Sequence, residues 1–322
     1  MSDFSADWLT LREEADARAR ANRLLDALMA ADRRTDGQLQ QQYSEILDLG
    51  AGTGANLRYL APHLGSGQRW RCIDQNPALL ARLPQATTDW AERHGYRIDV
   101  ETDTSSLRFA GPAWNGSAHC EQRNLAAAPG TEASPKQAPL PPGFPLPLPH
   151  AGLITASALL DLVSKDWLAN LISSCRRARC TLLFALSFDG RVVLAPGSPE
   201  DSAVSRLVNL HQRGEKGFGA ALGPSAPDVA EHLLTTAGYW WRSAKSDWQI
   251  GSDEPELQQT LIAGWLQAAL ELEPRARPWL MNWRRARHEQ IAAGALQIQV
   301  GHRDLIALPP ECVLPGAALT TT

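Results

Sequence analysis

Short apolar runs alternate along the chain with longer segments whose apolar residues recur every three or four positions. The short runs are typical of buried strands, and the longer segments are typical of amphipathic helices. Strands that alternate with helices predict an α/β fold built on a doubly wound, mostly parallel sheet. The expected strands are 45–49, 69–73, 151–155, 180–187, 239–250 and 296–308, and residues 97–125 should hold one or two more, the last near 119–123.

The expected helices are 6–32, 55–64, 76–93, 161–175, 201–212, 227–237, 255–272 and 278–292. We therefore divide the chain into an N-terminal helical segment, 1–40, and a main domain, 41–322, with a helical insertion at 254–293. The N-terminal helix either packs beside the main domain or lies over its ligand site. The proline-rich stretch 129–149 is expected to be a surface connector, because proline lacks the amide donor that helices and strands need. Residues 188–199 are expected to form a loop.

Composition limits the partners and the compartment. The formal charge is −4 over 322 residues, which disfavours a nucleic-acid partner. The sequence has no apolar stretch of membrane-spanning length, and its acidic N-terminus is unlike a signal peptide. Five scattered cysteines, without tight Cys/His spacing, indicate reduced thiols in the cytoplasm and no metal site. The composition leaves the oligomeric state open.

The richest local signal is a glycine loop between the first expected strand and the helix after it. The run 48–55 reads DLGAGTGA, with glycines at 50, 52 and 54. Glycines permit a tight turn and let a ligand approach the backbone, and amides at a helix start can bind an anionic group. Asp74, at the end of the next strand, stands where an acid binds the hydroxyls of a ribose.

Two cofactors fit this loop, because NAD and S-adenosylmethionine both carry a ribose. Gly50, Gly52 and Ala55 satisfy the G-x-G-x-x-A fingerprint of dinucleotide-binding proteins. Asp48 discriminates between the two cofactors, because a carboxylate just before the first glycine would repel a pyrophosphate. The methionine part of S-adenosylmethionine carries an ammonium and a sulfonium, so the charge of Asp48 favours S-adenosylmethionine.

At this point the sequence resembles a known family. The run EILDLGAGTGANLRYL resembles motif I of class I S-adenosylmethionine-dependent methyltransferases, and WRCIDQNPALLARL resembles motif II. The resemblance extends over about residues 45–187 and implies a Rossmann-like sheet of seven strands whose last strand is antiparallel. It also implies that Gly50, Gly52 and Gly54 line the cofactor, that Asp74 binds the ribose hydroxyls, and that Gln75 and Asn76 lie near the adenosine.

Two later segments extend the resemblance. The run 120–125, CEQRNL, stands where the family's third strand ends, which places Asn124 and Leu125 at the adenine. The amide oxygen of asparagine can accept a hydrogen bond from the adenine amine. The segment 151–163 is similar to the fourth strand and its following turn, which places Thr155, Ala156 and Ser157 toward the donor methyl group. The family often begins this strand with an acid, whereas Gly152 stands near that position here.

The acceptor is expected to be a small molecule that is methylated on oxygen or nitrogen. Methyl transfer needs mainly alignment of the acceptor and exclusion of water, so the family has no universal catalytic residue. The N/D-P-P-Y signature of methyltransferases that act on amino groups of nucleic acids and proteins is absent after the fourth strand, where TASALLD stands. The alternatives are an NAD-dependent oxidoreductase, an RNA methyltransferase and an inactive scaffold that binds the cofactor.

Four residues are candidates for acceptor chemistry. Asp161 lies six residues after Thr155 and is a candidate general base, and His211 is a second one. Arg213 and Lys216 follow His211 in a glycine-rich stretch and can bind a carboxylate or phosphate. We expect this stretch, 211–219, to close over the acceptor. The simpler alternatives are a helix cap for Asp161 and a solvated helix end for the rest.

Overall fold

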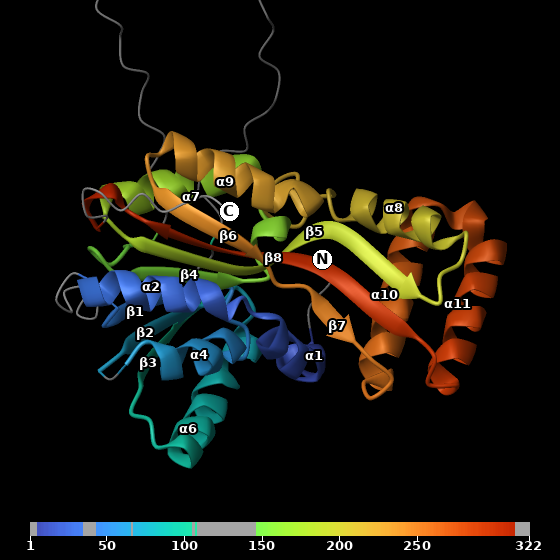
Figure 1. Cartoon of the computed structure of the whole chain (residues 1–322), viewed down its shortest axis with the longest axis horizontal. Coiled ribbons are helices and arrows are strands. Elements are labelled where there is room, and N and C mark those ends of the chain that lie inside the picture. Colours follow the sequence, from blue (N-terminus) through green and yellow to red (C-terminus); the bar gives the residue numbers. More distant parts are fainter. Residues whose placement is uncertain (1–4, 35–42, 66, 105–106, 108–145, 313–322) are drawn as a thin grey trace, which may run out of the picture.

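The computed structural model describes residues 5–34, 43–65, 67–104, 107 and 146–312. Within these ranges the chain forms one sheet with helices on both faces (Figure 1). The strand order is β3-β2-β1-β4-β5-β8-β6, and a short β7 also pairs with β8. β8 runs antiparallel to its neighbours, while β1 to β5 pair in parallel. The predicted doubly wound sheet with an antiparallel last strand is therefore confirmed.

The described strands number eight instead of seven, because the expected strand 239–250 is divided into two. The expected strand near 119–123 lies outside the described residues. Because β1, β2 and β4 are parallel, their carboxyl ends meet at one edge of the sheet, where open α/β sheets bind ligands. The strands are β1 (Glu45–Leu49), β2 (Arg69–Ile73), β3 (Asp99–Asp103), β4 (Leu153–Ser157), β5 (Thr181–Ala195), β6 (Trp240–Lys245), β7 (Trp248–Ile250) and β8 (Gln297–Leu308).

Side chains of the central strands are buried on both faces, as is usual for parallel strands covered by helices. Ile46 packs in the cluster of α2 and α4, whereas Leu47 and Leu49 pack under α7 and α9 on the opposite face (Figure 1). The helices are α1 (Ala6–Ala19), α2 (Asn22–Arg34), α4 (Ala55–Leu60), α5 (Pro77–Leu80), α6 (Leu83–His94), α7 (Lys165–Arg177), α8 (Asp201–His211), α9 (Ala226–Thr236), α10 (Pro255–Leu272) and α11 (Arg277–Ala292).

The single N-terminal helix expected over 6–32 is wrong, because the chain leaves the helical conformation at Arg20 (φ −55°, ψ 138°). Arg20 is buried there, and its Nη1 donates to Oδ1 of Asn56 at 3.0 Å. Asp304 on β8 lies 3.6 Å from Nε of Arg20 and accepts the amide of Ala21 at 2.9 Å. These contacts divide the segment into α1 and α2, although the apolar spacing continues through the break.

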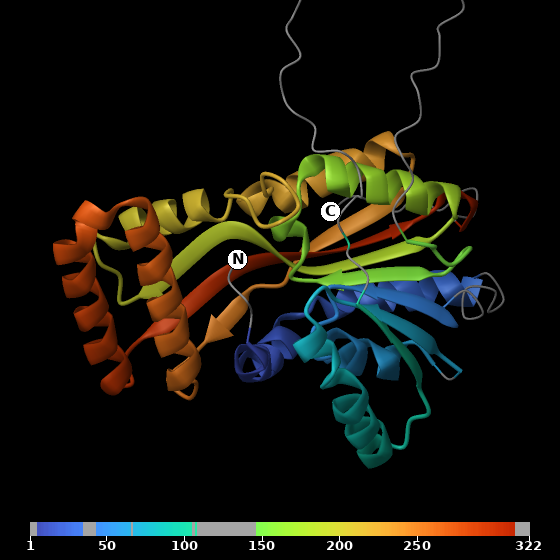
Figure 2. The same cartoon turned by 180° about the vertical axis from the view of Figure 1, so that it is seen from behind.

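The loop expected at 188–199 is also wrong over residues 188–195, because β5 continues to Ala195. β8 supplies the partners, with Phe188 opposite His302 and Ala195 opposite Gln297. The register shifts twice along this pair, and the extension carries α8, α10 and α11 (Figure 2). The helical pair expected from 255 to 292 is present as α10 and α11.

A buried ion pair joins these helices. Arg287 on α11 is ion-paired with Asp201 on α8, and only 1% of the Arg287 side chain is exposed. Oδ1 of Asp201 also accepts a hydrogen bond from Nε1 of Trp283 at 2.8 Å. The other end of the guanidinium donates to the carbonyl oxygen of Pro196 at 2.7 Å. Asp201 is therefore the counter-ion of a positive charge that water does not reach.

Replacing Asp201 with Ala is expected to lower the free energy of unfolding by about 3–5 kcal/mol, because it leaves a buried guanidinium without its carboxylate. Urea denaturation measures the change. Glu289→Ala is the matched control, since its partner Arg285 is 71% exposed and the pair is 3.2 Å apart. An exposed pair contributes about 0–1 kcal/mol. Equal losses in the two variants would show that the buried pair does not stabilise the extension.

Candidate active site

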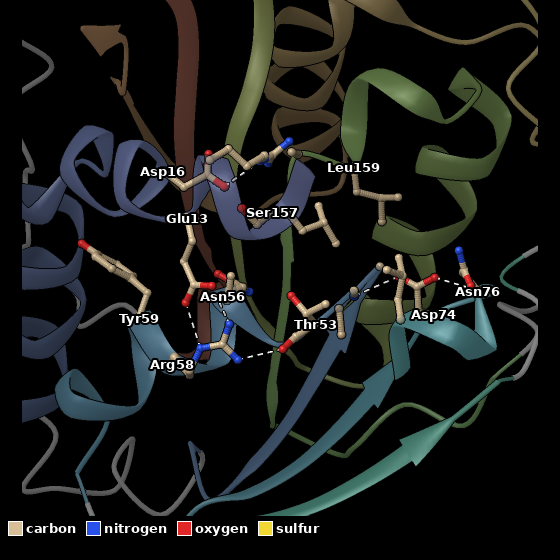
Figure 3. Close-up of a pocket in the computed structure, with 18 of the residues that line it drawn as sticks. Glu13, Asp16, Thr53, Asn56, Arg58, Tyr59, Asp74, Asn76, Ser157 and Leu159 are labelled. Atoms are coloured by element: carbon tan, nitrogen blue, oxygen red, sulfur yellow. Dashed lines mark hydrogen bonds and ion pairs between the residues drawn. The ribbon is translucent and has the colours of Figure 1, made fainter. Parts of the chain in front are cut away.

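The edge of the sheet formed by the carboxyl ends of β1, β2 and β4 opens into a cavity of about 810 Å³. This volume lies within the usual range for small-molecule and cofactor sites. Its wall is built from separate parts of the chain: α1, the glycine loop, the end of β2, α6, the turn after β4 and the loop after α8 (Figure 3). The cavity therefore brings together the two segments that resemble motifs I and II.

The glycine loop has the backbone that only glycine adopts easily. Gly52 and Gly54 have φ values of 55° and 86°, in the left-handed region. A Cβ atom on Gly52 would lie 2.9 Å from Leu9 of α1, and one on Gly54 would lie 2.9 Å from Leu83 of α6. Gly50 and Gly52 line the cavity, whereas Gly54 packs behind the wall. The loop thus combines a tight turn with close packing of two helices.

Asp74 lines the cavity at the end of β2, as the sequence predicted. Its Oδ2 accepts the amide of Gly52 at 2.9 Å, and its Oδ1 accepts the amide of Asn76 at 2.8 Å (Figure 3). A carboxylate has about four acceptor positions, so each oxygen can still accept a hydroxyl from a ligand. Gln75 and Asn76 also line the cavity.

Asp48 lies beneath the loop and not on the cavity wall. It shares a face of β1 with Ile46 and so points toward α4, where Nδ2 of Asn56 donates to its Oδ1 at 2.8 Å and to Oγ1 of Thr155 at 3.1 Å. Burial raises the pKa of Asp48 from 3.8 to about 7. Asp48 and Thr155 are fully buried and do not line the cavity, so the direct cofactor contacts expected of them are not possible in this arrangement. Asn56, which was not predicted from the sequence, lines the cavity and separates it from Asp48 and Thr155.

The first helix, α1, forms one wall of the cavity. Glu13 of α1 accepts hydrogen bonds from Nε and Nη2 of Arg58 at 2.8 and 2.7 Å. Nη1 of the same guanidinium donates to the carbonyl oxygen of Thr53, inside the glycine loop, at 2.7 Å (Figure 3). α1 therefore forms a wall of the cavity over the glycine loop, while Ala15 of the same helix packs in the core cluster of β7 and α10, so each interpretation of the N-terminal helix describes part of the arrangement. Neither Glu13 nor Arg58 was predicted to be a site residue.

The turn after β4 contributes Ser157, Leu159 and Leu162 to the wall. Asp161 lies behind this wall, and its Oδ1 has no hydrogen-bond partner among the described residues. Burial raises the pKa of Asp161 from 3.8 to about 6, and the charges of Arg12 and Lys216 act in the opposite direction. Asp161 does not line the cavity, so it reaches a ligand there only if the turn after β4 moves, and its role as a base stays a prediction.

The stretch 211–219 reaches the cavity through Lys216 and Phe218. Nε2 of His211 instead lies 2.8 Å from a carboxylate oxygen of Glu271 on α10, and Arg213 is exposed. Neither His211 nor Arg213 lines the cavity, so the roles expected of these two residues are wrong in position. The reason is that α8 packs against α10, which turns its last residues away from the cavity.

Two further features complete the cavity. Trp90 and His94 of α6 line it with stacked rings whose centroids are 4.9 Å apart, and the sequence analysis did not single them out. Asn124 and Leu125 lie outside the described residues, so their contacts with adenine stay predictions. Across the described ranges, no group of three or more His, Cys, Asp or Glu side chains is arranged to hold a metal ion.

No family model matches the sequence, and no curated protein matches it. Solved structures do match, at low identity. A cyclopropane-fatty-acyl-phospholipid synthase-like protein from Lactobacillus casei is 14% identical, with 94% of each chain covered and a TM-score of 0.44. The cyclopropane synthase MmaA2 from Mycobacterium tuberculosis is 10% identical over 87% of this chain and 83% of its own, with a TM-score of 0.37.

A putative sarcosine dimethylglycine methyltransferase from Galdieria sulphuraria is 16% identical over 88% of this chain and 85% of its own, with a TM-score of 0.35. None of these similarities is close enough to transfer a function. The fold is given by the chain's own topology, in which β1 to β5 pair in parallel and β8 is antiparallel. This is the Rossmann-like sheet with an antiparallel last strand that the resemblance implied. Among the described helices, none has both the length and the apolar character that crossing a membrane requires.

Replacing Asp48 with Asn is expected to stabilise the protein at neutral pH. Between about pH 4 and pH 7 the folded protein keeps a proton on Asp48 that the unfolded chain releases, so the free energy of unfolding of the wild type falls as pH rises. The Asn side chain has no such proton. The advantage of the variant should be small near pH 4 and reach at most about 4 kcal/mol above pH 7.

Urea denaturation of both proteins from pH 4 to pH 8 measures this difference, with the exposed Asp99→Asn as the control. A stability difference between wild type and Asp48→Asn that does not change with pH would contradict the raised pKa.

Proposed function

We propose that the protein is an S-adenosylmethionine-dependent methyltransferase whose acceptor is a small molecule methylated on oxygen or nitrogen. The observation that carries the proposal is the position of Asp74, whose carboxylate bridges the amides of Gly52 and Asn76 at the wall of the cavity. Two ribose hydroxyls can bind a carboxylate held in this way. The class I sheet order and the resemblance to motifs I and II support the same cofactor.

An NAD-dependent oxidoreductase is the alternative from another class. Its pyrophosphate would need free amides in the glycine loop. Here the amides of Gly50 and Ala51 donate to the carbonyl oxygen of Ile73 at 2.8 and 3.0 Å, and that of Gly52 donates to Asp74. Asp74 also lines the cavity and has no basic side chain within 4 Å among the described residues, so its charge disfavours an anionic pyrophosphate. The same charge suits a donor that carries an ammonium and a sulfonium.

An RNA methyltransferase is disfavoured by α1. The helix stands over the glycine loop and is attached to it through the pair of Glu13 and Arg58, which leaves a cavity of about 810 Å³. That space suits a cofactor with a small acceptor better than a nucleic-acid strand. The proposed location is the cytoplasm, which the free, buried thiols of Cys72, Cys175 and Cys180 support.

In this proposal the chain aligns the acceptor with the donor methyl group and excludes water, and positioning of this kind can supply about 7–11 kcal/mol. Gly50, Gly52, Gln75 and Asn76 line the donor, and Lys216 lies on the acceptor side. Asp161 is the general base when the acceptor must lose a proton. A pKa of about 6 leaves this carboxyl group ionised at neutral pH and able to take up a proton.

The cofactor assignment predicts that Asp74→Ala weakens binding of S-adenosylhomocysteine at least tenfold. The variant loses charge-assisted hydrogen bonds to two ribose hydroxyls, each worth about 1.5–3 kcal/mol. Calorimetry measures the affinity, and thermal unfolding shows that the variant is folded. Asp99→Ala removes an exposed carboxylate at the start of β3 and is the control. If the wild type binds NAD and not S-adenosylhomocysteine, the oxidoreductase is the correct alternative.

The role of Asp161 is tested once a screen with labelled methyl donor has identified an acceptor. Turnover of the wild type should rise with pH through about 6, where Asp161 loses its proton. Asp161→Asn should lower kcat by about 100-fold or more and abolish this rise, while donor affinity stays the same. Asp166→Asn changes an exposed carboxylate on α7 and serves as the control. An unaltered pH profile in Asp161→Asn would rule out this base.

A further inference from the structure

The positive charges on the described cavity wall are, with one exception, balanced by carboxylates of the protein. Among the described residues, four Lys or Arg side chains line the cavity, and three of them have a carboxylate within 4 Å. The fourth, Lys216, has none within that distance in the described part of the chain. The three pairs are Arg12 with Asp16 at 2.8 Å, Arg58 with Glu13 at 2.7 Å and Arg20 with Asp304 at 3.6 Å.

The loop that carries Lys216 is held in place by other residues. Oε1 of Glu215 accepts the amides of Gly217 and Gly219 at 2.6 and 3.0 Å, and Glu215 also forms a β-bridge with Ala220. The ring of Phe218 meets that of Trp167 edge-on, with 5.8 Å between centroids. Because these contacts fix the backbone, the ammonium group of Lys216 is not needed for the loop and is available to a ligand.

Apolar side chains line the cavity both in the loop that carries Lys216 and in the turn after β4. Phe218, Leu159 and Leu162 line the cavity with Lys216. A positive charge that becomes enclosed by a ligand without a counter-ion costs free energy, whereas an anionic group on that ligand offsets the cost. A ligand with an apolar body and one negative charge therefore matches this part of the cavity.

We infer that Lys216 binds a carboxylate or phosphate group of the methyl acceptor, and that the apolar body of the acceptor packs on Phe218, Leu159 and Leu162. That this ligand is the methyl acceptor rests on the proposed function, whereas the match between the ammonium group of Lys216 and an anionic group does not. The carboxylate of the donor's methionine part is a second source of the same chemistry. The acceptor is the favoured source, because Lys216 and Phe218 line the cavity from the loop after α8, whereas the residues proposed to hold the donor come from the glycine loop and the end of β2.

Three aromatic probes test this inference by NMR titration of protein saturated with S-adenosylhomocysteine. Phenylacetate and phenyl phosphate carry the anionic group, and phenylacetamide is their neutral counterpart. The wild type should bind the two anions at least tenfold more tightly than the amide. Lys216→Met should abolish this preference and Lys216→Arg should retain it. Lys165→Met, which removes an exposed lysine on α7, should behave as the wild type does.

A comparison of S-adenosylhomocysteine with 5′-methylthioadenosine, which lacks the amino-acid part, separates the two sources of the carboxylate. If Lys216 binds the acceptor, Lys216→Met should bind each of the two nucleosides with the same affinity as the wild type does. If Lys216→Met weakens S-adenosylhomocysteine but not 5′-methylthioadenosine, Lys216 binds the donor and the inference is wrong. A wild type without preference for the anions also overturns it.

Failure of the proposed function gives a different result, since the wild type would then not bind S-adenosylhomocysteine at all. In that case the same titrations, made without the nucleoside, still decide whether Lys216 selects an anion.

Discussion

The buried carboxylate of Asp304 is the contact on which the shape of the ligand cavity depends. Its Oδ1 accepts the amide of Leu186, where the register of β5 begins to shift, and its Oδ2 accepts the amide of Ala21, where α1 ends and α2 begins. The same group lies 3.6 Å from Nε of Arg20. One side chain thus fixes the irregular part of the sheet and the turn that sends α1 across the glycine loop. A buried carboxylate with these partners tolerates few alternative geometries.

The glycine loop is enclosed between two polar systems, each of which reaches α1. Above the loop, Arg58 joins Glu13 of α1 to the carbonyl oxygen of Thr53. Beneath it, Nδ2 of Asn56 donates to Asp48, while its Oδ1 accepts from Arg20. The first system ends at Glu13 of α1 and the second at Arg20, the C-cap of the same helix, so both the closing residues and the supporting residues are attached to α1. A small movement of α1 would therefore displace Asn56 and Asp48 at the base of the loop.

The sequence predicted what local patterns determine. β1 and β2 were found because each is an apolar run with its glycines or acid directly after it, and Gly50, Gly52 and Asp74 do line the cavity. The break at Arg20 and the extension of β5 depend on β8, whose partner residues lie far away in the sequence. Asp48 was misplaced because alternation along β1 turns it toward α4. Helix residues missed in the sequence and then found on the wall include Glu13, Asn56, Arg58, Trp90 and His94.

The bond between Ala21 and Asp304 spans 283 residues of the chain. A ribosome makes α1 long before β8, and domains form contacts as their parts become available. The turn after the first helix therefore has no anchor until β8 has been synthesised. A chain that lacks β8 would lack the bond that holds this wall of the cavity, so ligand binding reports that β8 is in place.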